Sequence, residues 1–232
     1  MGMRASGAGA SAQREYDRRR AADEAMVRAR WGRFGSLAVR LSEERQSTKA
    51  WSVGAEGERQ VGRALDAIAG EGLEVLHDRR IPRGRANIDH LVVTARGVLV
   101  VDAKRYRGRP ALRSEGGLFR SVTRSLTVGG RDQTKLVAGV QRQVEIVWGI
   151  LEEGGAAGVP VRGALCFVEA DWPMFGGSFQ VAGVRVLWPR LLAKHLRDPR
   201  RDLGGSRVDD DRGTGVDVPA VTALLEGCLL PA

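Results

Sequence analysis

The 232-residue sequence has few cysteines, few aromatic residues and no long hydrophobic run. Its two cysteines, Cys166 and Cys228, cannot build a disulfide framework, and neither has metal-ligating neighbours at zinc-finger spacing. Aromatic residues make up only 5% of the chain, so we expect an aliphatic core. No apolar stretch approaches the ~20 residues of a membrane span, and no secretory pattern is present. These absences predict a soluble, cytoplasmic protein.

Positive charge, by contrast, is abundant. The 37 Lys and Arg residues exceed the 28 Asp and Glu residues, which gives a formal net charge of +9. An excess of this size favours a polyanionic partner, and both nucleic acid and an anionic membrane surface fit it. Hydrophobic residues make up 43% of the chain, enough for a folded core, which excludes a disordered chain as the main state.

The sequence divides into three regions. Residues 1–50 combine a small polar tip with an Arg-, Glu- and Ala-rich stretch of helical periodicity, which predicts a basic helical arm that is partly disordered. Such an arm could contact nucleic acid, or it could cover one edge of the domain as a solvated helix. Residues 51–200 are predicted to form the main domain, and residues 201–232 a charged, glycine-rich linker followed by a C-terminal helix.

Helical and strand patterns alternate within the main domain and in the C-terminal region. This alternation predicts an α/β fold with a mixed sheet flanked by helices. We expect helices over 54–69, 132–151, 190–196 and 218–230, and strands over 74–78, 88–94, 98–106, 111–113, 118–121, 163–169 and 184–187.

Two aspartates lie where strand periodicity predicts burial. Asp102 and Lys104 fall on the same face of their strand as the valines that precede them. If the hairpin pairs Thr94 with Gly97, Asp89 lies directly opposite Asp102, with Cβ atoms roughly 5 Å apart. A bulge at Gly97 would shift this register by one residue and place the two carboxylates on different faces.

Like charges placed opposite each other across a hairpin call for a cation. Hard oxygen ligands on two strands suit Mg²⁺ or Mn²⁺, and Lys104 adds a cation that can face a phosphate. Metal-activated water beside an ammonium group is suited to attack on a phosphodiester. The alternative is a buried ion pair between Asp102 and Lys104 that only steadies the sheet.

Two further polar residues share helical stripes with apolar side chains. Glu58 lies on the stripe of Val61 and Leu65, where a lone carboxylate is costly without a cation or hydrogen bonds. Its alternative role is a first-turn carboxylate that interacts favourably with the helix dipole. Gln143 lies on the stripe of Val140 and Val147, either as a site residue or as a satisfied buried amide.

Arginines cluster in sequence around these residues. Beside a metal site they are predicted to contact phosphates, and the alternative is that they are ordinary solvated residues in an Arg-rich chain. The predicted nucleic-acid-binding residues are Arg79, Arg80, Arg83, Arg85, Arg105 and Arg107.

Three motifs in order resemble the nuclease-related domain (NERD) family of the PD-(D/E)xK, restriction-endonuclease-like superfamily. They are Gly54-Ala55-Glu56-Gly57-Glu58, Asn87-Ile88-Asp89-His90 and the run Val101 to Gly108. The resemblance covers about residues 51–155 and implies an αβββαβ core with Mg²⁺-dependent phosphodiester hydrolysis. It implies that Glu58, Asp89 and Asp102 bind the metal, and that Lys104 and Gln143 complete the catalytic set. Asp102 stands where the family more often has Glu, and Ile88 where Pro is expected.

These observations support three hypotheses about the function of the protein, each from a different functional class. The first is a metal-dependent nuclease that acts on DNA through a site of two carboxylates and a lysine. The second is a catalytically inactive nucleic-acid-binding module on the same fold. A third, attachment of residues 12–49 to anionic membranes, rests on charge alone.

Overall fold

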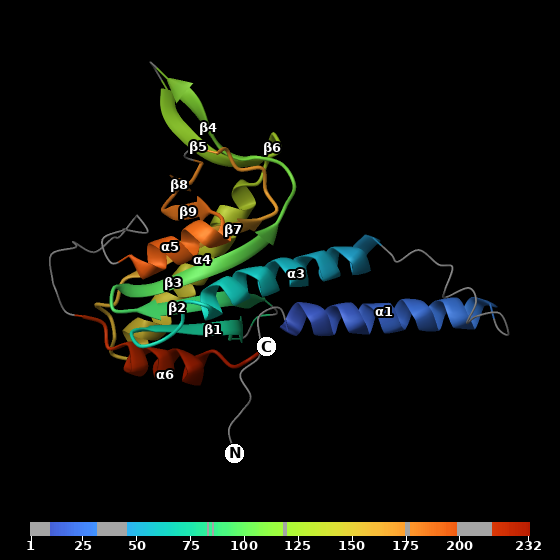
Figure 1. The fold of residues 1–232 in the computed structure, drawn as a ribbon, viewed down its shortest axis with the longest axis horizontal. Coiled ribbons are helices and arrows are strands. Elements are labelled where there is room, and N and C mark those ends of the chain that lie inside the picture. Colours follow the sequence, from blue (N-terminus) through green and yellow to red (C-terminus); the bar gives the residue numbers. More distant parts are fainter. Residues whose placement is uncertain are drawn as a thin grey trace.

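The computed structural model describes residues 10–31, 46–82, 84, 86–117, 120–174, 177–198 and 215–232. A six-stranded mixed sheet lies at its centre, with helices on both faces, and a second sheet of three strands extends from one end (Figure 1). The predicted fold class is confirmed, because one helix precedes three antiparallel strands, and a second helix then leads to a parallel strand.

The central sheet has the strand order β1-β2-β3-β7-β9-β8. Strands β1, β2 and β3 form an antiparallel meander, β7 lies parallel to β3, β9 parallel to β7, and β8 pairs antiparallel with β9. Their bounds are β1 Leu73–Arg80, β2 Asn87–Thr94, β3 Gly97–Arg105, β7 Val161–Val168, β8 Phe179–Val181 and β9 Val184–Leu187.

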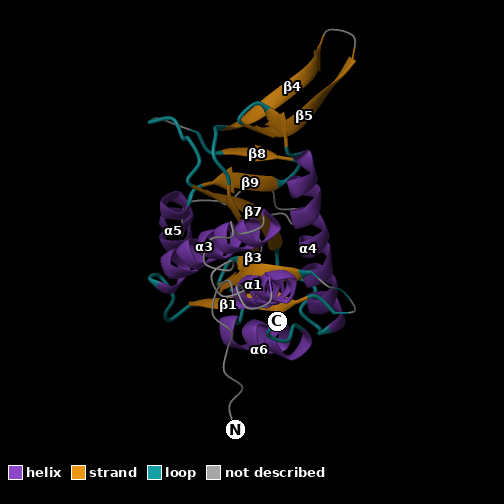
Figure 2. Ribbon diagram, turned by 90° about the vertical axis from the view of Figure 1, so that its right-hand side faces the viewer, coloured by secondary structure: helices purple, strands orange, loops and turns teal. Residues whose placement is uncertain are grey.

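Helices cover the two faces of this sheet in pairs (Figure 2). α3 (Gln46–Asp66) and α5 (Pro189–Arg197) pack on one face through aliphatic residues that include Val61, Leu65 and Leu192. α4 (Thr134–Glu153) and α6 (Val218–Cys228) pack on the other. The buried clusters consist mainly of Val and Leu, as the low aromatic content predicts.

The N-terminal region includes α1 (Ala10–Trp31), which packs along α3. α3 begins at Gln46, earlier than the predicted Gly54, and so crosses the boundary expected between residues 50 and 51. No helix in the described ranges has both the length and the apolar character that a membrane crossing requires.

The strands after β3 are longer than the sequence pattern predicts. β4 (Pro110–Gly117) and β5 (Arg120–Val128) form an antiparallel hairpin, and β6 (Arg131–Asp132) extends β5 to give the second sheet. The prediction of two short strands was wrong here, because exposed β-strands rich in Arg, Ser and Gly lack the apolar alternation that marks a half-buried strand.

A tight turn fixes the register of β2 and β3. Thr94 pairs with Gly97 and His90 with Val101, so the register that we predicted for the two aspartates is present and no bulge occurs at Gly97. Gly97 has φ +121°, and a Cβ there would lie 2.3 Å from the carbonyl oxygen of Pro160. Only glycine therefore fits this turn without a shift of the backbone.

We predict that Gly97→Ala lowers the free energy of unfolding by about 3 kcal/mol, because the methyl group meets backbone and the φ angle is unfavourable. Gly72→Ala is the matched control. Gly72 also has positive φ, +82°, but its added Cβ would have no atom within 4 Å, so about 1–2 kcal/mol is expected. Urea unfolding of both variants measures the difference, and equal losses would contradict the clash with Pro160.

Candidate functional site

The candidate site lies where β2 and β3 separate. Their backbone ladder ends at the pair His90–Val101, although β2 begins at Asn87 and β3 runs on to Arg105. In the gap, Oδ2 of Asp89 accepts a hydrogen bond of 2.8 Å from the backbone N–H of Ala103. The Asp89 side chain thus takes the place of a strand–strand hydrogen bond, and it is held toward the strand that carries Asp102.

Lys104 forms an ion pair with Asp102 on the same strand face. Its Nζ lies 2.8 Å from each carboxylate oxygen of Asp102 and also donates to the carbonyl of Ala103 at 3.3 Å. Asp102 is 8% exposed, so this carboxylate depends on the ammonium for compensation. The ion pair between Asp102 and Lys104, which was the alternative interpretation of the sequence, is therefore present.

Helix α3 brings a third carboxylate to this place. Gly57 is buried against β3, and a Cβ on it would lie 3.0 Å from the Cβ of Arg105. This close approach sets the first buried turn of α3 directly over the strand that carries Lys104. Glu58, the next residue, is half-buried and lies close enough to Lys104 and Asp102 for their charges to affect it.

The pKa of Glu58 is raised to about 7, chiefly by burial. The negative charges of Asp78 and Asp102 contribute to this rise, whereas Lys104 and Arg59 act in the opposite direction. The pKa of Asp89 is likewise raised well above its usual range, first by burial and then by the charge of Asp102. The ammonium of Lys104 is the positive charge that acts on both Glu58 and Asp89.

The pKa of Lys104 is also raised, although burial acts on it in the opposite sense. Burial alone would lower it, but the negative charges of Asp102, Asp89 and Glu58 outweigh burial and raise the pKa above its ordinary value. Lys104 is therefore held as an ammonium ion. The structure thus brings together Glu58, Asp89, Asp102 and Lys104, the four residues predicted from different segments.

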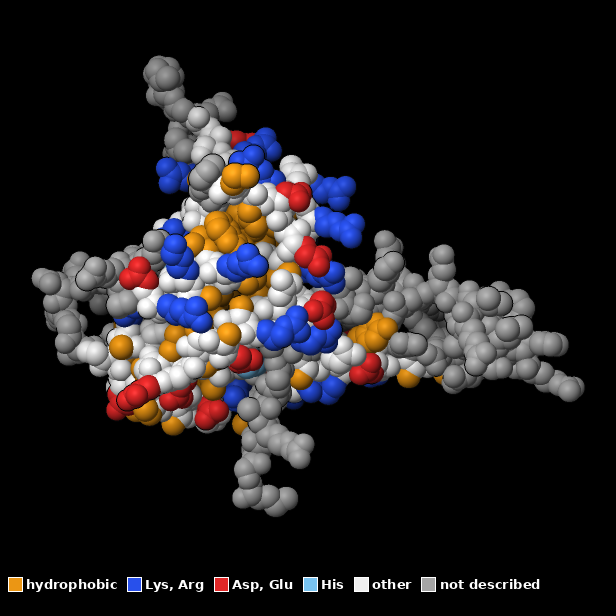
Figure 3. All heavy atoms as spheres, viewed as in Figure 1, with side chains coloured by type: hydrophobic (Ala, Val, Ile, Leu, Met, Phe, Trp, Pro, Cys, Tyr) orange, Lys and Arg blue, Asp and Glu red, His pale blue; other side chains and the backbone are white. Residues whose placement is uncertain are grey.

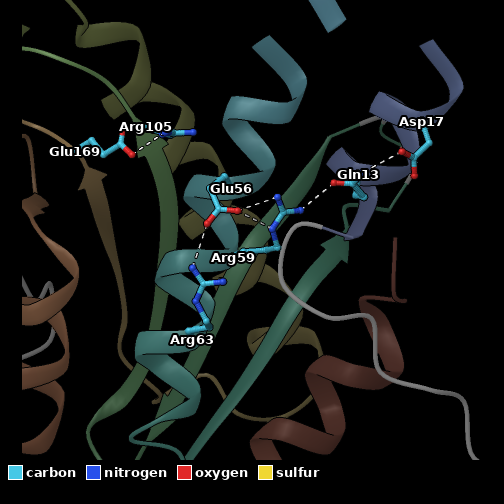
Figure 4. Close-up of polar contacts among 7 residues, drawn as sticks. All are labelled: Gln13, Asp17, Glu56, Arg59, Arg63, Arg105 and Glu169. Atoms are coloured by element: carbon cyan, nitrogen blue, oxygen red, sulfur yellow. Dashed lines mark hydrogen bonds and ion pairs between the residues drawn. The ribbon is translucent and has the colours of Figure 1, made fainter. Parts of the chain in front are cut away.

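Glu56, by contrast, is paired with two arginines of its own helix (Figure 4). Its carboxylate accepts hydrogen bonds from Arg59 at 2.9 Å and from Arg63 at 3.1 Å, and these bonds lower its pKa. The two glutamates are only two residues apart, yet the helix places them in opposite environments.

Asp78 on β1 is a site neighbour that the sequence reasoning missed. Only 2% of it is exposed, and it has a positive φ of 50°. It accepts hydrogen bonds from the side chain of Asn87 at 3.1 Å and from the backbone N–H of Ser11 at 2.5 Å. Strand alternation would place Asp78 on the face of the buried Leu76, but its positive φ interrupts that alternation, so periodicity does not predict its position.

Gln143 on α4 reaches the start of β2 rather than the carboxylates. Its Nε2 donates to the carbonyl of Asn87 at 3.4 Å, and its Oε1 is buried with no hydrogen-bond partner. Gln143 thus contacts the segment that carries Asp89, two residues before it.

Two histidines beside the site form a polar chain that sequence analysis did not predict. Nδ1 of His77 and Nδ1 of His90 are 2.8 Å apart, and Nε2 of His77 lies 2.8 Å from Oδ1 of Asp66. His90 is fully buried, and its pKa falls to about 3 because of burial and the neighbouring His77. A neutral His90 adds no charge next to Asp89.

The predicted phosphate-contacting arginines have different surroundings. Arg79 is only 3% exposed, and its guanidinium donates to the carbonyl of Leu229 at 3.4 Å and to Glu226 at 3.3 Å. This position corrects the prediction for Arg79. Its cross-strand partner Ile88 packs in the same cluster as α6, because the positive φ of Asp78 interrupts the alternation that would place Arg79 on the face of His77. Its neighbour Arg80 faces solvent.

The other arginines of this set are less enclosed. Arg105 is half-buried and donates to Glu169 at 2.7 Å (Figure 4). Arg107 is exposed. Arg83 and Arg85 lie outside the described residues.

A divalent cation fits the charge and the donor chemistry of this cluster. Three carboxylates share a single ammonium, and carboxylate oxygens are the ligands that Mg²⁺ and Mn²⁺ prefer. Within the described residues, no three His, Cys, Asp or Glu side chains form a ready metal cluster.

The model of one protein family, the nuclease-related domain, matches residues 53–168, which is half of the chain. The match runs from α3 through β7, so it includes Glu58, Asp89, Asp102 and Lys104. Comparisons with curated proteins and with solved structures found no match.

We predict that the metal-free protein becomes less stable as the pH rises from about 4.5 to about 7. The folded state holds the Glu58 proton more tightly than the unfolded state, whose carboxyl has the ordinary pKa of 4.5. Relative to Glu58→Gln, the wild-type protein should lose about 2 kcal/mol across this window. Urea unfolding in EDTA at a series of pH values measures the loss.

Glu56→Gln is the control for this titration. The pKa of Glu56 is lowered by Arg59 and Arg63, so its contribution to stability is present above pH 4.5 and disappears only as the pH falls. This variant should keep the wild-type decline. Parallel curves for Glu58→Gln and the wild type would contradict the raised pKa of Glu58.

Proposed function

The chain belongs to the nuclease-related domain family, and from this membership we propose that it is a metal-dependent nuclease that hydrolyses phosphodiester bonds in DNA. The observation that carries the proposal is the approach of Asp89, Asp102 and Glu58 to Lys104 at the point where two strands separate. Burial of that many carboxylates destabilises the fold unless a cation compensates them. The overall charge of +9 supports a polyanionic substrate.

Asp89 and Asp102 would hold Mg²⁺ or Mn²⁺, with Glu58 beside them. When bound, such a cation would polarise a phosphate oxygen and favour ionisation of water. The Lys104 ammonium would stabilise the negative charge that develops on the phosphate in the transition state. In the metal-free protein the pKa of Glu58 is about 7, so its carboxylate can take up a proton at neutral pH, whereas a bound cation would favour the ionised form.

Gln143 would act as a positioning residue in this mechanism. Through its hydrogen bond to the Asn87 carbonyl, it would hold the start of β2 and thereby the orientation of Asp89. Arg80 and Arg107 are exposed and would contact phosphates, whereas Arg79 would stabilise the packing of α6 on β1.

The alternative is a catalytically inactive nucleic-acid-binding module. One observation favours it: both carboxylate oxygens of Asp102 lie 2.8 Å from Nζ of Lys104, an arrangement that is complete without a metal. Nuclease assays on plasmid, linear duplex and single-stranded DNA with Mg²⁺, Mn²⁺ or EDTA distinguish the two functions.

We predict that Asp89→Asn lowers metal-dependent cleavage by about 100-fold or more while DNA binding is retained. The Asn carbonyl can still accept the hydrogen bond from Ala103, so the strands should stay in place, and the loss of a buried charge should raise the melting temperature. Asp66→Asn, which alters an aspartate outside the carboxylate cluster, is the control. Wild-type cleavage by Asp89→Asn would place the site elsewhere.

Lys104→Ala tests whether the lysine acts in catalysis or only in folding. It leaves Asp102 buried without its partner, so we predict a loss of about 3 kcal/mol in stability together with a fall in cleavage of about 100-fold. The double variant Asp102→Asn/Lys104→Ala removes the stranded charge and should regain stability without activity. Unchanged turnover in Lys104→Ala, measured on the same sample as its melting curve, would contradict a catalytic role.

A further inference from the structure

The hairpin of β4 and β5, here called the β-arm, projects from the domain (Figures 1 and 2). Its inner end is part of the core, where Leu126 and Val128 are buried beside Phe167 and Val181. Its outer part is different. Side chains of residues 112–115 on β4 and 123–124 on β5 are exposed.

Core packing does not explain the length of the β-arm. Consecutive exposed residues on both strands mean that both faces of the ribbon meet solvent at these positions, so the side chains described there cover no apolar surface. A two-stranded ribbon of this kind is marginally stable, and ordering it costs conformational entropy. A ligand that binds the ordered ribbon would account for its presence.

The charge of the β-arm indicates the kind of ligand. Residues 107–131 contain six arginines and one acidic residue, Glu115. Glu115 is paired with Arg113 at 2.5 Å, but the side chains are 61% and 60% exposed, so the pair is weak. Basic side chains gather where the β-arm leaves the domain (Figure 3). Exposed arginines of this segment are Arg107, Arg109, Arg113, Arg124 and Arg131.

The strand register places arginines on both faces of the ribbon. Arg113 is opposite Ser125, and Arg124 is opposite Ser114. Cross-strand partners point to the same face and neighbours along a strand to opposite faces, so Arg113 and Arg124 lie on opposite faces. Such a ribbon can meet phosphates on both sides, as it would between the two walls of a nucleic-acid groove.

We propose that the β-arm binds the major groove of double-stranded DNA and positions the duplex at the carboxylate site. This inference rests on the proposed nuclease function and adds the substrate class. The major groove of B-form DNA, about 12 Å wide, admits a two-stranded β-ribbon. The deep, narrow major groove of A-form RNA does not, and a single strand has no groove.

The connection between site and β-arm is short and fixed. Pro110, the first residue of β4, comes six positions after Lys104. The carbonyls of Gly108 and Arg109 accept hydrogen bonds of 3.1 Å from Asp171 and Gly129, and the Tyr106 ring packs edge-on against Phe167. A duplex held by the β-arm would therefore keep a defined position relative to Lys104.

Binding is measured in EDTA with full-length protein, so that cleavage plays no part. The probes are a fluorescein-labelled blunt DNA duplex of mixed sequence, one of its strands, and the RNA duplex of the same sequence, at a series of KCl concentrations. We expect the wild type to prefer the DNA duplex. The variant Arg113→Gln/Arg124→Gln should weaken duplex binding and reduce the slope of log affinity against log salt by about 1.8, because each lost phosphate contact contributes about 0.9.

Two controls test whether the effect belongs to the β-arm. Arg142→Gln removes an exposed arginine from α4 and should leave affinity and slope close to wild type. Glu115→Gln removes the single acid of the segment and should raise duplex affinity. A variant with residues 114–124 replaced by Asn-Gly keeps the pair Arg113–Ser125 beside a two-residue turn, and should lose the preference for duplex over single strand.

Three results would overturn the inference: wild-type affinity and slope in the Arg113→Gln/Arg124→Gln variant, equal losses on duplex and single-stranded DNA, or no wild-type binding to the DNA duplex. Failure of the proposed nuclease function has a different readout. It would appear as no metal-dependent cleavage of any DNA substrate by the wild type, and an arm-dependent preference for duplex measured in EDTA would still stand.

Discussion

The hydrogen bond from the Ala103 backbone N–H to the Asp89 carboxylate holds the candidate site together. It forms where the ladder between β2 and β3 has already ended, so a side chain keeps the two strands in proximity. Asp89 is thereby fixed close to Asp102. The negative charges of these two residues raise the pKa of Lys104, and that of Asp102 also raises the pKa of Glu58. The glycine turn at residue 97 fixes the register on which this contact depends.

Electrostatic competition within this cluster links stability to function. Asp102 is buried and Glu58 and Asp89 are partly buried around one ammonium, and burial together with mutual repulsion raises the pKa values of Glu58 and Asp89. A fold selected for stability alone would replace such residues with apolar side chains. Retaining like charges at this cost is typical of a site that binds a cation or performs chemistry.

Much of the arrangement around the site follows from strand alternation and helix periodicity. The fold class, the pairing of the 88–94 and 98–106 segments and the inward position of Glu58 were predictable, because buried charged residues stand out against apolar stripes. The β-arm and Asp78 were not predicted. The exposed ribbon has no apolar periodicity, and Asp78 is buried through contacts with Asn87 and Ser11 that are distant in the chain.

The sequence by itself determined which residue types are present, which strand or helix face they share and the family to which the chain belongs. Only the tertiary structure decided which of them meet. Arg79 and Arg80 are adjacent and chemically identical, yet packing against α6 buries the first while the second stays exposed. Periodicity describes one element at a time, whereas burial, charge compensation and pKa depend on which elements pack together, and that is a property of the whole fold.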